Sequence, residues 1–215
     1  MAQGPAGRAH PALAPGDRRP DLQPMRRSLA ILCLALLPGL ALAQSTPATP
    51  RGAEARRAEL DRAFEALRAA PDSAGATLVE ARIRELWSQA ITPAVALLLR
   101  RGVRNMEAGQ HADALEDFDA AIVLGPEVAE AWHLRAQASL RLGDLPAAAR
   151  DLQEALRLEP RHWGVLLSLS TMQDEAGNAQ AALRSLEAAL AINPKLAGGE
   201  ERLREQRRKA EGDAL

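Results

Sequence analysis

One interval, of about 34 residues, recurs through the middle of this chain and constrains its fold more than any other feature. Glycine, alanine and proline return at that interval three times in succession. The recurring sets are Gly109, Gly143 and Gly177; Ala114, Ala148 and Ala182; Ala121, Ala155 and Ala189; and Pro126, Pro160 and Pro194. A fixed period of this length is typical of chains that stack one supersecondary unit on the next. We therefore predict an all-α, right-handed solenoid of three helix-turn-helix units, at residues 95–128, 129–162 and 163–196.

Within each unit, the recurring residues predict two antiparallel helices. The glycine suits the left-handed conformation that ends a first helix, and the proline ends the second helix. The alanines lie at helical spacing on one face, where small side chains let two helices approach closely. One large apolar residue of each second helix is expected to fill the space between the pairs, and these residues are Phe118, Leu152 and Leu186.

These residues resemble the tetratricopeptide repeat family, whose consensus places Gly, Ala, a large apolar residue, Ala and Pro at the same offsets. The resemblance covers residues 95–196, nearly half of the chain. It departs from the family where a tyrosine is usual in the first helix, because Asn105, Ser139 and Gln173 stand there. We therefore expect looser packing at those three positions. The resemblance implies a non-catalytic scaffold that binds a peptide or protein in a groove lined by the first helices.

Residues 25–43 are expected to direct the chain out of the cytoplasm. Residues 25–43 have a positive start, a short apolar run and a small-x-small end, which together are typical of a secretory signal peptide. Residues 1–24 are predicted to be an upstream extension from a mis-assigned start, and 44–52 a flexible linker. The only cysteine, Cys33, lies within the signal. We expect a periplasmic or secreted protein; the alternative is a membrane anchor formed by an uncleaved signal.

Two segments flank the predicted repeats. Residues 53–92 predict a degenerate helix pair that shields the edge of the first unit, and 197–215 predict a polar capping helix and tail. Basic residues gather in the C-terminal segment, at Arg202, Arg204, Arg207, Arg208 and Lys209. Glutamates interleave with them and the net charge of the chain is −1, so we predict a solvated cap and no nucleic-acid partner. No stable membrane insertion is expected after signal cleavage.

No set of residues at catalytic or metal-binding spacing is evident. His111, His133 and His162 fall in different helices or turns, without cysteine or a paired histidine at metal spacing. The acidic run of Glu116, Asp117 and Asp119 is interpreted as a solvated outer face. We therefore predict no catalytic residues, no metal site and no cofactor.

The inner groove supplies the candidate partner-binding residues, by counting in threes and fours along the first helices. They are Leu99, Val103, Met106, His133, Gln137, Arg141 and Thr171. The middle unit is favoured, because His133, Gln137 and Arg141 have no evident core partner. In the alternative, the N-terminal helices fold over Leu99 and its apolar neighbours and bury them.

Function is therefore predicted as protein binding in the bacterial cell envelope, through the concave groove. The alternative is a structural subunit packed permanently in an envelope assembly. Some relatives in the family grip the C-terminal tails of chaperones with Lys and Asn side chains. The matching positions here do not carry such side chains, which argues against that type of partner; they include Leu99, Val103, Leu134, Gly164 and Ser168.

Overall fold

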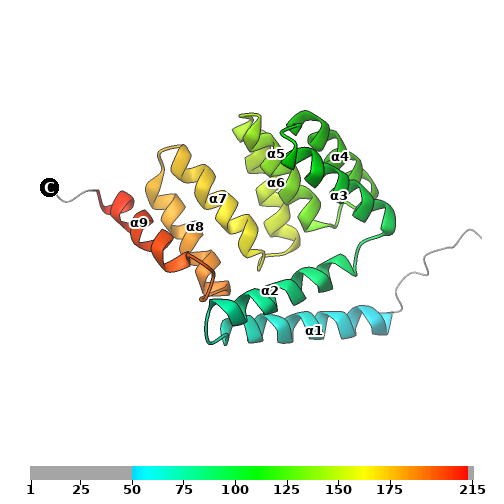
Figure 1. Ribbon diagram of the computed structural model, residues 1–215, viewed down its shortest axis with the longest axis horizontal. Coiled ribbons are helices and arrows are strands. Elements are labelled where there is room, and N and C mark those ends of the chain that lie inside the picture. The colour runs from blue at the N-terminus through cyan, green and yellow to red at the C-terminus, as the bar shows by residue number, and fades with distance from the viewer. Residues whose placement is uncertain (1–49, 213–215) are drawn as a thin grey trace, which may run out of the picture. The chain divides into compact units, whose positions relative to one another are not determined.

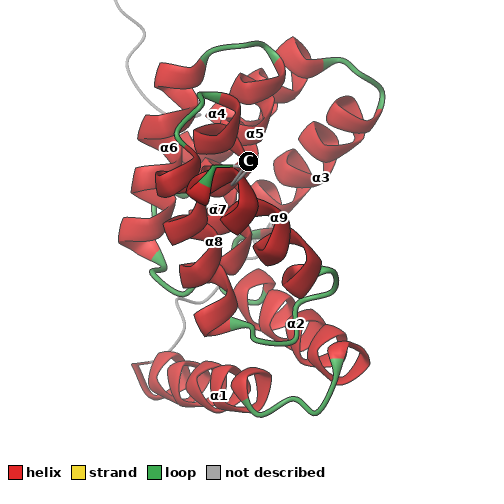
Figure 2. Ribbon diagram, turned by 90° about the vertical axis from the view of Figure 1, so that its left-hand side faces the viewer, coloured by secondary structure: helices red, strands yellow, loops and turns green. Residues whose placement is uncertain are grey.

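The computed structural model describes residues 50–212, and all the regular secondary structure in that part of the chain is helical (Figures 1 and 2). The helices are α1 (Pro50–Arg68), α2 (Ser73–Ser88), α3 (Pro93–Glu107), α4 (His111–Leu124), α5 (Ala129–Arg141), α6 (Leu145–Leu158), α7 (Trp163–Glu175), α8 (Ala179–Ile192) and α9 (Gly199–Glu211). This confirms the all-α class and the nine predicted helices for the described residues. The predicted extension, signal and nearly all of the linker lie outside them.

Three helix pairs form the centre of the described part: α3 with α4, α5 with α6, and α7 with α8. The second helices begin at His111, Leu145 and Ala179, so their starts keep the spacing of the sequence repeat. The glycines that separate the helices of each pair have φ values of 74°, 81° and 76°, at Gly109, Gly143 and Gly177. These left-handed conformations are the reason that glycine recurs there.

The recurring apolar residues form the core, as the sequence predicts. All six recurring alanines of the second helices are fully buried, and so are Phe118 and Leu152, with Leu186 nearly so. The closest approach is in the first pair, where Gly102 of α3 faces the Phe118 ring. A Cβ added to Gly102 would lie 2.4 Å from Phe118 Cε1. A glycine is therefore required opposite the largest of the three core side chains.

At two of the three positions where tyrosine is usual in the family, the side chain makes a hydrogen bond to the second helix of its pair. Asn105 Nδ2 donates to Asp117 Oδ2 at 2.9 Å, and Gln173 Oε1 accepts from Ser185 Oγ at 2.7 Å. Ser139, the third of these residues, is buried. In the first and third pairs, a polar contact between the two helices thus takes the place of the tyrosine ring.

The N-terminal pair, α1 and α2, does not shield the edge of the first unit, and that prediction is wrong. The buried side chains of α1 and α2 instead form one core with α7 and α8, and α1 lies against α8 (Figure 1). The members of this core include Phe64, Leu67, Ile83, Leu86, Trp163 and Ala189. The physical reason is that the inner side of α7 is apolar, with Leu166 and Leu167 beside Trp163. Burying apolar surface against α7 is therefore favourable.

Polar contacts also hold α1 and α2 in this position. The Arg161 guanidinium donates to Asp61 Oδ1 at 2.6 Å and lies 4.2 Å from the centroid of the Phe64 ring. Asn193 Nδ2, which is buried at the end of α8, donates to Glu80 Oε1 of α2 at 2.6 Å. The N-terminal pair is thus joined to α7, α8 and the turn before α7 by apolar packing, an ion pair and a buried hydrogen bond.

The C-terminal helix α9 packs on α8. Gln206 Nε2 donates to Asp174 Oδ1 at 3.0 Å, and Lys209 Nζ donates to Asp174 Oδ2 at 2.7 Å. Arg207 pairs with Glu187 at 3.1 Å. Acidic partners therefore satisfy part of the basic run, in agreement with a solvated cap. Within residues 50–212, no helix has both the length and the apolar character that crossing a membrane requires.

Candidate functional site

A cleft of about 700 Å³ lies where the N-terminal pair faces the inner side of α3 and the start of α5. One wall carries Leu60 of α1 and Trp87 of α2. The opposite wall carries Ala96 and Leu99 of α3, with Val128 at the entry to α5. A cavity of this size with mainly apolar walls and a few polar groups is typical of binding sites in proteins.

Four arginines line this cleft, and two of them have polar partners in the protein. Arg56 donates to the backbone oxygen of Gln89 at 3.2 Å, and Arg84 pairs with Glu80 at 3.3 Å. Arg57 and Arg100 also line the cleft, and no ion pair is found for either among the described residues. These two guanidinium groups can therefore attract a negatively charged group that enters the cleft.

Of the predicted partner-binding residues, only Leu99 lines the cleft. Val103 and Met106 are half-buried and pack with Leu99 in the core that α3 shares with α4 and α5. Leu99 itself is buried in that core, although the N-terminal pair is not what buries it. The alternative in which α1 and α2 bury these three residues is therefore not what the structure shows.

The polar candidates of the middle unit differ in burial: His133 is buried, Gln137 is half-buried and Arg141 is exposed. His133 is 6 % exposed, and its Nε2 lies 3.0 Å from Ser168 Oγ and 2.9 Å from Gln137 Nε2. The expectation that His133 and Gln137 lack core partners is therefore wrong, because α7 packs against that side of α5. Arg141 is exposed at the end of α5. Thr171 is exposed beside α9, and its hydroxyl donates to the Leu167 backbone oxygen at 3.1 Å.

Three ligand-type side chains converge at the inner end of the cleft, contrary to the prediction of no metal-type cluster. They are Glu130 in the first turn of α5, His133 one turn later, and His162 at the N-cap of α7, with one nitrogen or oxygen from each lying within 4.8 Å of the others. Glu130 Oε2 lies 2.9 Å from His162 Nε2 and 3.6 Å from His133 Nδ1. Both histidines are buried, whereas 42 % of the Glu130 side chain is open to the cleft.

Neighbouring groups hold the two imidazole rings in place. The Trp87 ring stacks on His162, with centroids 4.6 Å apart and an interplanar angle of 17°. His162 Nδ1 accepts from the Val165 backbone N–H at 3.3 Å, so its Nε2 carries the proton that it donates to Glu130. Gly164 leaves space for both rings, since a Cβ there would lie 3.2 Å from His133 Cε1.

The electrostatics of this cluster favour an ionised carboxylate. Burial acts to raise the pKa of Glu130, but the nearby His133 ring, 3.6 Å away, and the hydrogen bond from His162 outweigh it and hold that pKa at about 2. Glu130 is therefore a carboxylate at neutral pH. The cluster presents one negative charge and two buried imidazoles at the edge of a cleft.

The sequence contains a usable signal for part of this cluster. At the register positions of Glu130 and His133, the other units carry Ala96 and Leu99, or Gly164 and Leu167. The middle unit is therefore the only one of the three with ligand-type side chains there. His162 is harder to find, because it precedes α7 as its N-cap instead of lying on the helix face.

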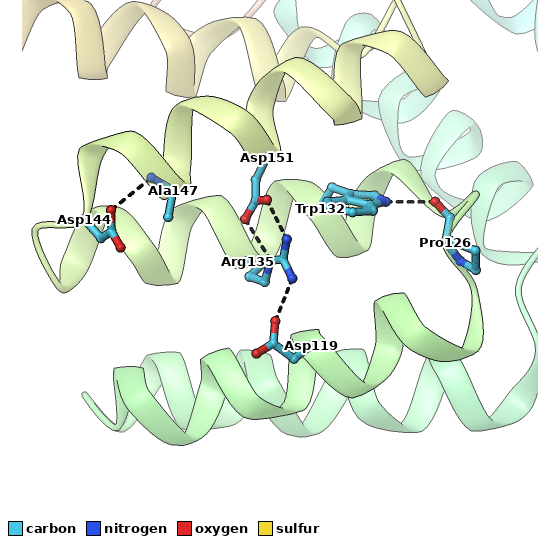
Figure 3. Close-up of polar contacts among 7 residues, drawn as sticks. All are labelled: Asp119, Pro126, Trp132, Arg135, Asp144, Ala147 and Asp151. Atoms are coloured by element: carbon cyan, nitrogen blue, oxygen red, sulfur yellow. Dashed lines mark hydrogen bonds and ion pairs between the residues drawn. The ribbon is translucent and has the colours of Figure 1, made fainter.

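The acidic run of α4 is not simply a solvated face, and that interpretation is wrong for two of its members. Asp117 is buried and accepts from Arg101 Nε at 2.5 Å. In the next pair, Arg135 donates to both oxygens of the buried Asp151, at 2.8 and 2.6 Å, and to Asp119 at 2.7 Å (Figure 3). These carboxylates therefore join consecutive helices.

The described helices define an all-helical repeat protein built from packed antiparallel helix pairs. The family model for the tetratricopeptide repeat matches residues 99–158 and 133–197. A TPR repeat-containing protein of Rhizobium etli is 30 % identical over 135 residues, which are 63 % of this chain and 66 % of that protein. Residues 99–197 are therefore similar to the tetratricopeptide repeat family.

Two further comparisons find tetratricopeptide repeat proteins. Human tetratricopeptide repeat protein 36 is 42 % identical over 74 residues, 34 % of this chain and 39 % of that protein. The matched part of the chain thus spans less than two thirds of each of these two relatives. Among solved structures, the first TPR of Spaghetti (RPAP3) bound to an HSP90 peptide has a TM-score of 0.53 and 16 % identity, covering 57 % of this chain and 97 % of that one. This last likeness shows the fold.

Proposed function

We propose that this protein is a non-catalytic interaction scaffold that holds an extended segment of a partner protein in the cleft between α2 and α3. The observation that carries the proposal is the cleft itself, of about 700 Å³, with Leu99 and Trp87 on facing walls. Apolar side chains of an extended peptide can bury their surface against these walls, and the peptide backbone can remain at the solvent side. The tetratricopeptide repeat is typically an interaction domain, which supports a binding role over catalysis.

The charges of the cleft favour a segment with an acidic residue. Arg57 and Arg100 both line it without an ion pair among the described residues. A carboxylate of the partner can accept charge-assisted hydrogen bonds from these two guanidinium groups. In the free protein, water takes that place. The RPAP3 domain of similar fold is bound to an HSP90 peptide, which supports a peptide as the ligand class. The lack of a Lys and Asn clamp at the positions given above favours an internal segment over a C-terminal tail.

For the architecture, we propose three units of about 34 residues each in a right-handed solenoid, with α9 as the polar cap. For the location, we propose the bacterial cell envelope, because residues 25–43 have the three parts of a signal peptide. The chain is then expected to begin at Gln44 after cleavage. N-terminal sequencing of the protein purified from its own cells tests this; an intact segment 1–24 in a cytoplasmic fraction contradicts it.

Site-specific photo-crosslinking tests the binding proposal. A photoreactive amino acid at Ala96, on the cleft wall, should capture a partner in living cells, and the same amino acid at Val123 should not. Val123 is a suitable control because it lies on α4 and is 80 % exposed. Capture from Val123 and none from Ala96 would place the working surface on the outer helices and refute the proposal.

A charge variant extends the test to the predicted chemistry. Arg57→Glu with Arg100→Glu should weaken the captured complex, whereas Arg150→Glu, an exposed change on α6, should not. The alternative of a permanently assembled structural subunit predicts a different result. In that case, the protein elutes from gel filtration only as part of a large complex, and adding the partner segment at any concentration does not change this.

A further inference from the structure

We propose that Glu130, His133 and His162 form a binding site for one transition-metal ion of the Zn²⁺ type, with an open coordination position facing the cleft. Two imidazole nitrogens and one carboxylate oxygen form one of the donor sets that zinc takes in its three-ligand protein sites. The three ligands all come from this chain, so the ion can bind in the absence of a partner.

The spacing of the donor atoms fits a tetrahedral ion. Bonds of about 2.0–2.1 Å to nitrogen and oxygen place neighbouring ligand atoms roughly 3.3 Å apart. Glu130 Oε2 lies 3.6 Å from His133 Nδ1 and 2.9 Å from His162 Nε2, on either side of that value. All three donor atoms lie within 4.8 Å of one another. A small movement of the Glu130 carboxylate therefore makes room for the ion between them.

A second observation points to a ligand at this place. His133 Nδ1 is buried and has no hydrogen-bond partner, although it faces the Glu130 carboxylate. A buried nitrogen without a partner is costly and calls for an explanation. The other nitrogen of the ring, Nε2, lies 3.0 Å from Ser168 Oγ. Gln137 Nε2 lies 2.9 Å from the same nitrogen, so the Gln137 amide must turn to present its oxygen when His133 Nε2 carries the proton. In that tautomer the ring donates from Nε2 and presents a lone pair from Nδ1 to the ion.

The surroundings leave one side of the site open. Glu130 and His162 both line the cleft, whereas His133 lies behind them in the core. A fourth ligand, either water or a donor group of a bound molecule, can reach the ion only from the cleft. Three protein ligands with one open position distinguish such a site from the closed four-ligand sites that only stabilise a fold.

Metal binding has a local consequence that can be measured. The ion takes the lone pair of His162 Nε2, so the ring proton moves to Nδ1. The hydrogen bond from the Val165 N–H to Nδ1, at 3.3 Å, is then lost. This bond is already long for an N–H donor, so it is one of the weaker bonds at the start of α7. The Val165 amide keeps its bond to the His162 backbone oxygen, at 3.0 Å, so its hydrogen exchange should become only modestly faster in the metal-bound protein.

The direct test is titration of the full chain with Co²⁺, followed by competition with Zn²⁺. We expect one Co²⁺ per chain with the intense visible absorption of a four- or five-coordinate ion, displaced by one Zn²⁺. His133→Gln and Glu130→Gln should each weaken binding by about tenfold or more, and His111→Gln, which removes a histidine outside the cluster, should not. Circular dichroism of each variant reports whether the helices are retained.

Two results would overturn the proposal. The first is a wild-type chain that binds neither Co²⁺ nor Zn²⁺, or that gives only the weak pink spectrum of an octahedral hydrated ion. The second is folded His133→Gln and Glu130→Gln proteins that bind Co²⁺ as tightly as the wild type. If His133→Gln unfolds, Glu130→Gln decides the question alone, because its side chain is partly open to the cleft and keeps its shape.

Discussion

Replacement of Gly102 by alanine should change the stability of the fold with opposite signs in two backgrounds. In the wild type, the new Cβ would lie 2.4, 2.7 and 2.8 Å from three carbons of the Phe118 ring. Favourable carbon–carbon contacts are about 3.5–4.0 Å, so α3 and α4 must move apart or the ring must leave its rotamer. Overpacking of a tight core costs about 1–3 kcal/mol.

The helix itself favours the change. Alanine is better than glycine in a helix interior by about 1 kcal/mol, because glycine loses more backbone freedom on folding. The two effects oppose each other, and we expect Gly102→Ala to destabilise the protein by about 1 kcal/mol. The second unit shows how the clash is avoided, since its corresponding residues are Ala136 and Leu152, both fully buried.

The sign should therefore reverse once Phe118 becomes leucine. Phe118→Leu alone loses stability because it leaves unfilled volume beside Gly102. Adding Gly102→Ala then fills that volume and gains the advantage of alanine over glycine in a helix interior. The double variant should therefore be more stable than Phe118→Leu by about 1 kcal/mol. The coupling between the two sites is then about 2 kcal/mol, within the range for residues in direct contact.

Urea denaturation of the four proteins, followed by circular dichroism, measures this cycle. The reasoning is refuted if Gly102→Ala changes the free energy of unfolding by the same amount in both backgrounds. It is also refuted if the single change stabilises the wild type, since the Phe118 ring would then not limit the approach of α3 and α4.

The remaining predictions test other contacts. Arg135→Met leaves Asp151 buried without its bidentate partner and should cost about 3–5 kcal/mol in urea denaturation; a loss near zero would show that the pair is hydrated. Ala148→Trp should destabilise the chain by about 1–3 kcal/mol or more, because a fully buried crossing has no space for the ring, and unchanged thermal melting would disprove the register. The hydrogen bond from Lys209 lowers the pKa of Asp174. The contribution of ionised Asp174 to stability is therefore present above the ordinary carboxyl pKa and is lost as the pH falls through the lowered pKa. The difference in stability between wild type and Asp174→Asn should thus be full at neutral pH and should disappear as the pH falls below the ordinary carboxyl pKa of about 4. A difference independent of pH would contradict this.

The repeat core is predictable because each of its requirements is local and recurs. A left-handed turn demands glycine at Gly143 as it does at Gly109, and a close helix crossing demands alanine at Ala148 as it does at Ala114. The same period also carries a signal for buried ion pairs between the helices. Arg101 and Asp117 recur one repeat later as Arg135 and Asp151, and both pairs form in the structure.

The docking of the N-terminal pair could not be predicted in the same way. A helical pattern shows that Phe64, Leu67 and Ile83 share an apolar face, but it does not show which surface will cover that face. The choice depends on contacts far apart in the sequence, such as that between Arg161 and Asp61. The pairing of Glu130 with His162 is hidden for the same reason, because it depends on how α5 meets the loop before α7.

The position of the N-terminal pair narrows the surface available to a partner. In an uncovered repeat array, the first helices of all three units would offer their inner sides. Here Trp163 and Leu167 are occupied by the core that they share with α1 and α2, so the open inner surface lies beside α3. Trp87 forms a wall of that opening and also stacks on His162. A shift of α2 therefore alters the width of the cleft and the support of the His162 ring together, which links the two proposed sites through one side chain.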